Sequence, residues 1–282
     1  MVKRVLFIEE AIRTHSPKTV LDIGCGNGFY LTSPLARRFL GVFFLGIDTD
    51  RESIEQARLA NPAPNLEFSF PEDVGEGRAF DLVIASEVIE HVEEPGEFLR
   101  SLIMRLNPGG KIFLSMPNAY GPFEISCFFD SLMYLAVIRY LVRTKRALLS
   151  FWRGKPTVRE GGNTLFLARD TLAVSPHINF FSYGSMLRLI DGVGLRIIRF
   201  APRVFLCGPL FDRIIRSESW ISWNTRVCDN LPDRLASGWM FLLERDPAKG
   251  ILGFPYRRSV LERVRREISV RRLLDWAGMQ SQ

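Results

Sequence analysis

The stretch "LDIGCGNGFYL", residues 21–31, places three glycines two positions apart directly behind a short apolar run. Each of these glycines, Gly24, Gly26 and Gly28, loses more conformational freedom on folding than any other residue would. A tight turn is one reason to use them, and a ligand that the backbone must approach closely is another. The segments around the stretch decide between the two.

Strand and helix signals alternate over the first 120 residues and again after residue 180. Apolar and β-branched runs that end at turn residues predict strands, and apolar positions three or four apart predict helices. The expected strands are "TVLDIG" (19–24), "FLGID" (44–48), "NLEFSF" (65–70), "FDLVIAS" (80–86), "KIFLSMP" (111–117), "LRIIRF" (195–200) and "SGWMFLLER" (237–245), and the expected helices include "SIEQARLA" (53–60) and "PGEFLRSLIMRLN" (95–107). Strand, helix, strand at this spacing predicts an α/β fold with a parallel sheet and right-handed crossovers.

The alternation breaks between about residues 121 and 176, where apolar, aromatic and basic side chains are mixed. We interpret this part as a helical lid or insertion in one domain that covers residues 1–250. After it, Ser182 is expected to cap a helix. Residues 251–282 are expected to form a basic helical tail.

Composition and charge indicate a globular protein with a basic surface. Of the 282 residues 47% are hydrophobic, and the formal net charge is +6. Such a surface fits an anionic partner such as a membrane, a nucleic acid or a phosphorylated substrate, and it fits equally the absence of any such partner.

The four cysteines are scattered without a C-x-x-C pair and there are three histidines, so no structural metal site is expected. The start "MVKRVLFIEEAIR" lacks the apolar core of a signal peptide. No stretch reaches the ~18 uncharged apolar residues of a membrane span. We therefore predict a cytoplasmic protein.

The spacing of the glycines and the positions of two carboxylates limit which ligands the segment can bind. A dinucleotide fingerprint has the spacing G-x-G-x-x-G, but here Phe29 stands where its third glycine belongs, which weakens an NAD assignment. Asp48 ends the second expected strand, where a carboxylate can accept hydrogen bonds from two ribose hydroxyls and would repel a 2′-phosphate. Asp22 suits an ammonium or sulfonium cation, or else it caps a turn or helix.

Four segments in this order resemble the successive motifs of class I S-adenosylmethionine-dependent methyltransferases: "VLDIGCGNG", "GIDTD", "FDLVIASEVIEHVEEP" and "LNPGGKIFLSMPN". The branch that includes ubiquinone-biosynthesis O-methyltransferases is the most similar. The resemblance is strong over residues 18–120, moderate over residues 177–200 and slight elsewhere. It implies a Rossmann-like, mostly parallel seven-stranded sheet with an antiparallel last strand and helices on both faces. It also implies S-adenosylmethionine as the cofactor.

The resemblance further implies which residues bind that cofactor. Asp48 matches the acid that holds the ribose, Thr49 lies beside the adenine, and Glu72 or Asp73 meets the adenine amine. Residues after the fourth strand lie near the methionine part. The implied cofactor-binding residues are Asp22, Gly24, Cys25, Gly26, Gly28, Asp48, Thr49, Glu72, Asp73, Ser86 and Glu87.

The small set of histidines limits the candidates for a catalytic base. Methyl transfer from a sulfonium is a direct displacement, which needs a base only when the acceptor carries a proton at neutral pH. His15 precedes the first strand and is expected at the surface. His91 follows the fourth strand, where it takes part either in chemistry or in packing and capping. His177 precedes the helix that flanks the acceptor pocket in relatives, and is the candidate base.

The acceptor is the least determined part. "ASEVIE" after the fourth strand differs from the Asn-Pro-Pro-Tyr type of motif found in amino-methyltransferases of nucleic acids, which favours an oxygen acceptor. Residues 123–153 and the tail combine aromatic with basic side chains, which fits either a lid or peripheral contact with an anionic membrane. We predict an O-methyltransferase for a small, lipid-linked or sugar-containing acceptor. The alternatives are an RNA methyltransferase, which would need an RNA-binding module that the sequence does not reveal, and a catalytically silent binding protein.

Overall fold

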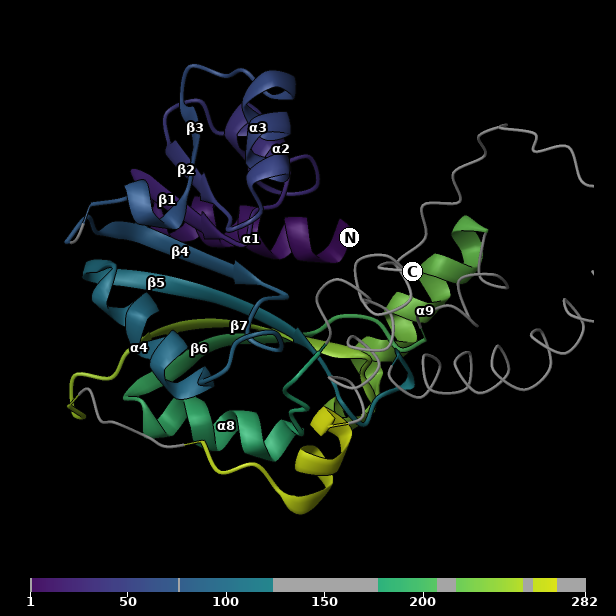
Figure 1. Cartoon of the computed structure of the whole chain (residues 1–282). Coiled ribbons are helices and arrows are strands. Elements are labelled where there is room, and N and C mark those ends of the chain that lie inside the picture. The colour runs from purple at the N-terminus through teal and green to yellow at the C-terminus, as the bar shows by residue number, and fades with distance from the viewer. Residues whose placement is uncertain (1, 76, 124–176, 207–216, 251–255, 268–282) are drawn as a thin grey trace, which may run out of the picture.

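Seven strands of the described residues form one sheet in the order β3-β2-β1-β4-β5-β7-β6 (Figure 1). The computed structural model describes residues 2–75, 77–123, 177–206, 217–250 and 256–267. The strands are β1 (Thr19–Ile23), β2 (Phe43–Ile47), β3 (Leu66–Ser69), β4 (Phe80–Ser86), β5 (Leu106–Pro117), β6 (Leu195–Pro202) and β7 (Gly238–Arg245). β7 runs antiparallel to both of its neighbours, and the remaining pairs are parallel. The predicted α/β class and mostly parallel seven-stranded sheet are confirmed.

Helices cover both faces of the sheet, because alternate side chains of each strand point to opposite faces and both faces are apolar. On one face Val20, Phe44 and Ile84 pack against α1 (Val2–His15), α2 (Thr32–Arg38) and α3 (Arg51–Ala60). On the other face Leu21 and Val83 pack against α4 (Pro95–Met104) and α8 (Tyr183–Gly192). Figure 1 shows the two helical layers on opposite sides of the strands. A further helix, α9 (Glu218–Asn230), connects β6 to β7.

Local signals placed most elements correctly. Ser182 caps α8 as predicted, and its side chain accepts a hydrogen bond from the Ser185 N–H. The helix expected over residues 95–107 ends earlier, at Met104. Asn107 instead donates to Asp81 Oδ1 at 2.8 Å, which draws the chain into β5.

The parallel strands direct their carboxyl ends to one edge of the sheet, the usual ligand edge of such folds. The chain has an insertion after β5, between Pro117 and the start of α8 at Tyr183. The lid expected there lies outside the described residues from residue 124 to residue 176. The expected tail is described over residues 256–267, where residues 260–267 are helical. Within the described part of the chain, no helix is long and apolar enough to cross a membrane.

Candidate functional site

The glycine segment after β1 is a bend with three left-handed residues. Gly24, Gly26 and Gly28 have φ angles of +72°, +54° and +69°. At two of these positions packing also demands glycine, because a Cβ on Gly24 would overlap Val88 and a Cβ on Gly28 would overlap the ring of Phe68. The packing around the bend therefore requires glycine at its first and last positions, whether or not a ligand is bound.

Gly26, the middle glycine, borders open space, since a Cβ there would meet nothing within 4 Å. Its N–H donates to Asp48 Oδ2 at 2.8 Å, and the Asp50 N–H donates to Asp48 Oδ1 at 3.0 Å. A carboxylate offers about four acceptor positions, so two remain for the hydroxyls of a bound sugar. The open space beside Gly26, which we call the cradle, leaves room for a nucleoside, and the half-buried Asp48 has acceptor positions for its sugar hydroxyls.

Asp22 is 2% exposed and accepts a hydrogen bond of 2.5 Å from Thr32 Oγ1, at the first residue of α2. Burial raises the pKa of Asp22 to about 7, although the Thr32 hydrogen bond and Arg4 oppose the shift. Asp22 is thus bonded to the first side chain of α2 but does not cap the helix backbone, and its predicted contact with the cofactor stays a prediction. Nearby, burial and the charges of Asp22 and Asp48 raise the pKa of Cys25, so its side chain stays a thiol.

The residues expected around the adenine lie at the same edge of the sheet. Glu72 and Asp73 are exposed and belong to the short 3₁₀ helix η1 (Pro71–Asp73), which follows β3. Glu72 pairs at 3.0 Å with Arg51, the first residue of α3. Thr49 is exposed between Asp48 and that helix.

The residues after β4 form a charged network. The hydroxyl of Ser86 accepts from Arg4 Nη1 at 2.8 Å and lies 3.0 Å from that of Ser115. Glu87 has a left-handed φ of +60°, accepts from Ser115 Oγ at 2.9 Å and pairs with Arg203. Burial opposes ionisation of Glu87, but Arg203 and Arg4 outweigh it and lower the pKa. The site therefore holds a charged carboxylate at the end of β4.

Two histidines predicted from the sequence lie together next to this network. The rings of His91 and His177 contact each other edge to face, with 4.9 Å between their centroids. Glu90 beside them is 1% exposed, and its carboxylate oxygens have no hydrogen-bond partner among the described residues. Burial and the charge of Glu87 raise the pKa of Glu90 to about 8, although His177 opposes this. His15, in contrast, lies exposed at the end of α1.

The same three side chains offer donor atoms to a metal. One oxygen of Glu90 and one nitrogen each of His91 and His177 lie within 4.8 Å of one another. Carboxylate and imidazole are ligands that many divalent cations accept. The sequence-based expectation of no metal stays a prediction.

Sequence reasoning did not find four residues of the site. Arg4, Glu90, Ser115 and Arg203 come from α1, the loop after β4, β5 and the segment after β6. Glu90 lies within the quoted motif "EVIEHVEEP", but nothing in that motif indicates its burial. The others meet only because the sheet brings their elements together.

A family model described as "Methyltransferase domain" matches residues 2–199. The chain belongs to this family. Among curated relatives, the methyltransferase is 40% identical to "Ubiquinone biosynthesis O-methyltransferase" of Caulobacter vibrioides over 106 residues, which are 36% of this chain and 41% of that protein. It is 33% identical to the protein of the same name from Proteus mirabilis over 121 residues, 41% of this chain and 48% of that protein. The matches thus span less than half the length of these relatives.

Among solved structures, the methyltransferase shares its fold with PKMT2 of Rickettsia typhi in complex with AdoHcy. The TM-score is 0.50 and the identity is 16%, over 86% of this chain and 50% of that chain. The resemblance predicted from the motifs is confirmed, and the protein is a class I S-adenosylmethionine-dependent methyltransferase.

Gly26→Ala is expected to weaken S-adenosylmethionine binding at least about tenfold, because its Cβ would enter the open cradle. The left-handed φ costs about 1–2 kcal/mol, which lowers the Tm of a chain of this size by a few degrees. Gly28→Ala is expected to lower Tm further, since its Cβ would also overlap Phe68. Calorimetry and thermal unfolding measure the two effects. Wild-type affinity in Gly26→Ala would show that the cofactor does not lie beside this glycine.

Proposed function

We propose that this protein methylates an oxygen of a small, lipid-linked or sugar-containing acceptor. The observation that carries the proposal is the contact between His91 and His177 after the carboxyl end of β4, the edge of the sheet at which the glycine bend follows β1 and Asp48 follows β2. An imidazole titrates near neutral pH and is therefore suited to take a proton from a hydroxyl acceptor. The partial similarity to ubiquinone-biosynthesis O-methyltransferases supports an oxygen acceptor.

In the proposed reaction, bound S-adenosylmethionine supplies a methyl group on a sulfonium sulfur that leaves as a neutral thioether. Asp48 and the backbone at Gly26 hold the nucleoside, so that the methyl carbon has a fixed position. His177 takes the proton of the acceptor hydroxyl while the oxygen forms its bond to the methyl carbon. His91 packs against His177 and orients its ring. The protein contributes mainly alignment and one proton transfer.

Glu90 sets the charge around the proposed base. Its pKa of about 8 means that most Glu90 side chains are protonated at neutral pH, which leaves Glu87 as the charged carboxylate of this loop. Glu90 in this state does not repel electron density that develops on the acceptor oxygen.

The test is a transfer assay with S-adenosylmethionine labelled in its methyl group. The purified protein is incubated with quinone precursors, glycolipids, polyketides and RNA in separate reactions. We expect the label in a base-stable O-methyl ether, because the proposed acceptor group is a hydroxyl. Label in RNA would favour the RNA methyltransferase instead, and binding without transfer to any acceptor would favour the silent binding protein.

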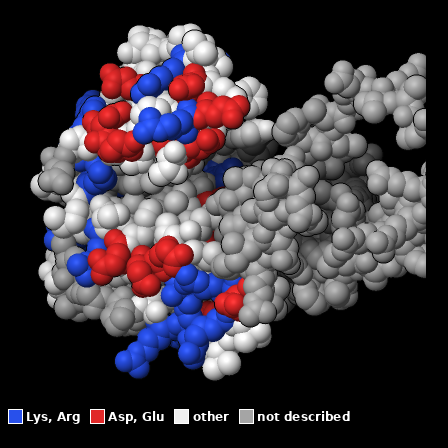
Figure 2. Space-filling view, in the orientation of Figure 1, with Lys and Arg blue, Asp and Glu red and all other residues white. Residues whose placement is uncertain are grey.

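We further propose that the protein docks on anionic membranes from the cytoplasmic side. The helix of residues 260–267 exposes Val260, Leu261 and Val264 by 69%, 54% and 51%, and Arg257 and Arg263 are exposed near them. Figure 2 shows basic side chains gathered at the lower edge of the view, where this segment lies. A groove of about 640 Å³ there is lined by Arg257, Arg258, Arg263, Arg266 and Glu267. Apolar and basic groups on one short helix suit the interface of an anionic bilayer.

Flotation with liposomes tests this docking. The wild type is expected to float with phosphatidylcholine vesicles that contain phosphatidylglycerol, and less as salt is raised, because salt screens exposed charges. The double variant Arg257→Glu/Arg263→Glu is expected to lose most of this binding. Arg188→Glu, a change at an exposed arginine of α8, serves as the control. Near-zero recovery of the wild type with both neutral and anionic vesicles would exclude the docking.

A further inference from the structure

The segment of residues 256–267 lies beyond residues 2–199, which the family model matches, yet it returns to the loop after β4. It is well anchored. Tyr256 packs on Phe181 at 5.3 Å between ring centroids, and Glu262 accepts from the Ser259 N–H at 2.7 Å to start the helix of residues 260–267. These contacts give the segment a defined position next to the loop that carries His91.

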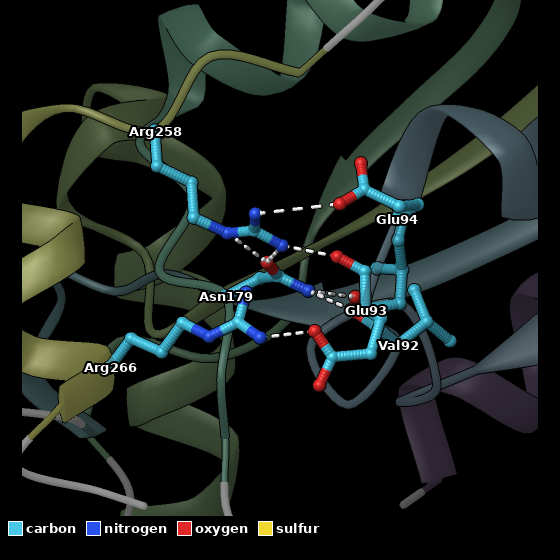
Figure 3. Close-up of polar contacts among 7 residues, drawn as sticks. Val92, Glu93, Glu94, Asn179, Arg258 and Arg266 are labelled. Atoms are coloured by element: carbon cyan, nitrogen blue, oxygen red, sulfur yellow. Dashed lines mark hydrogen bonds and ion pairs between the residues drawn. The ribbon is translucent and has the colours of Figure 1, made fainter.

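Arg258 makes the main contacts from this segment. Its side chain is 14% exposed, and its Nε and Nη2 donate to Asn179 Oδ1 at 3.1 and 2.9 Å. Nη2 also donates to the backbone oxygen of Glu93, and Nη1 lies 3.8 Å from a carboxylate oxygen of Glu94 (Figure 3). Arg266 adds an ion pair with Glu93. Two arginines therefore clamp the loop from one side.

Asn179 joins Arg258 to the loop that carries His91. It is 3% exposed, and its Nδ2 donates to the backbone oxygens of Ile89 at 3.1 Å and Val92 at 2.6 Å. A side-chain amide has two donor and two acceptor positions, and in Asn179 all four are used. Among the described residues, Arg258 supplies both donors to the amide oxygen.

The backbone next to Asn179 completes the link to His177. The N–H groups of Ile178 and Asn179 both donate to the backbone oxygen of Glu90, at 2.9 and 3.0 Å. His91 follows Glu90, and His177 precedes Ile178, so each histidine is one residue from this junction. The orientation of the Asn179 amide therefore helps to fix how the two imidazole rings meet.

We propose that Arg258 is a positioning residue for the reaction, which holds the Asn179 amide and thereby the contact between His91 and His177. The inference rests on the proposed role of His177 as the base. A segment outside the matched domain then contributes to the turnover number without touching cofactor or acceptor. Loss of Arg258 leaves a buried amide oxygen without its donors, which favours rotation of the amide away from the loop.

Arg258→Met is expected to lower kcat about 10–100-fold, because a displacement of about 1 Å at a reacting group has effects of this size. The affinity for S-adenosylmethionine is expected to stay within about twofold, since no contact of Arg258 reaches the glycine bend or Asp48. Arg258→Lys, which keeps the charge and one donor group, is expected to be intermediate. Arg188→Met removes an exposed arginine of α8 and is expected to match the wild type.

Two further measurements separate positioning from general destabilisation. In a His177→Ala background, Arg258→Met is expected to change kcat no further, because its effect acts through His177. Spectra of protein labelled with ¹⁵N in histidine contain three imidazoles, and Arg258→Met is expected to shift those of His91 and His177 but not that of His15. Circular dichroism and Tm verify the fold of each variant.

Unchanged imidazole spectra or wild-type kcat in a folded Arg258→Met protein would overturn the inference. An equal loss of kcat in the His177→Ala background would do so too. Failure of the proposed function gives a different result, in which His177→Ala itself keeps wild-type turnover. The histidine spectra do not depend on activity, so they test the positioning of the rings in either case.

Discussion

His177→Ala is expected to reduce kcat about 10²–10⁴-fold, the range in which a positioned general base contributes. The structure places His177 against His91, 4.9 Å between ring centroids, at the end of the sheet where parallel strands bind their ligands. The affinity for S-adenosylmethionine is expected to stay the same, because the proposed cofactor contacts come from the glycine bend and Asp48 and not from His177. Steady-state kinetics with the acceptor from the transfer assay and calorimetry with the cofactor give the two quantities.

His15→Ala is the matched control for this change, since His15 is exposed at the end of α1. It is expected to keep wild-type turnover. His91→Ala is expected to lose less activity than His177→Ala, because its proposed role is to orient the ring of His177. Wild-type kcat in His177→Ala would remove the base from the mechanism.

Asp48→Ala is expected to weaken S-adenosylmethionine binding about 100-fold. Hydrogen bonds to a charged group contribute about 1.5–3 kcal/mol each, and Asp48 has acceptor positions for two hydroxyls. Two such bonds at the lower end of this range contribute about 3 kcal/mol together, which corresponds to a factor of slightly more than about 100 in affinity. Calorimetric titration of the folded variant measures it.

Asp50→Ala is the matched control for the ribose carboxylate. Asp50 lies two residues beyond Asp48, is exposed, and accepts a hydrogen bond from Ser53 at the start of α3. Its loss is expected to lower Tm slightly and to leave cofactor affinity unchanged. Equal affinities of Asp48→Ala and Asp50→Ala would contradict the assignment of Asp48.

The fold could be predicted from the sequence because its signals are local. The run "FDLVIAS" is apolar enough for a strand buried on both faces, and β4 covers those same residues, Phe80–Ser86. Ser182 predicted the start of α8 by its capping side chain. The end of α4 was placed three residues late because Asn107 prefers a side-chain contact with Asp81, which lies outside any local window.

The site was predictable only in part for the same reason. The glycines and Asp48 belong to short motifs, whereas the bonds that complete the site join residues far apart in the sequence. Arg4 and Ser86 are 82 positions apart, Glu87 and Arg203 are 116 apart, and Asn179 and Arg258 are 79 apart. Periodicity and spacing carry no information on such pairs, which are set by strand order and helix packing.

The same limit applies to the basic tail. Its composition predicted one solvated or membrane-facing surface, but the arginines of the described part fall into two groups, one bonded to the rest of the protein and one exposed. Arg258 and Arg266 bind the loop after β4, and Arg265 donates to the Ala119 oxygen at 2.6 Å. Arg257 and Arg263 are exposed. Only the fold reveals which basic side chains point inward.

A crystal structure of the wild type with S-adenosylhomocysteine would test the cofactor site most directly. The two ribose hydroxyls should lie within hydrogen-bonding distance of the Asp48 carboxylate, with the nucleoside against the backbone of Gly26. A nucleoside bound elsewhere on the chain, or no bound nucleoside at a saturating concentration, would contradict the assignment of this bend as the cofactor site.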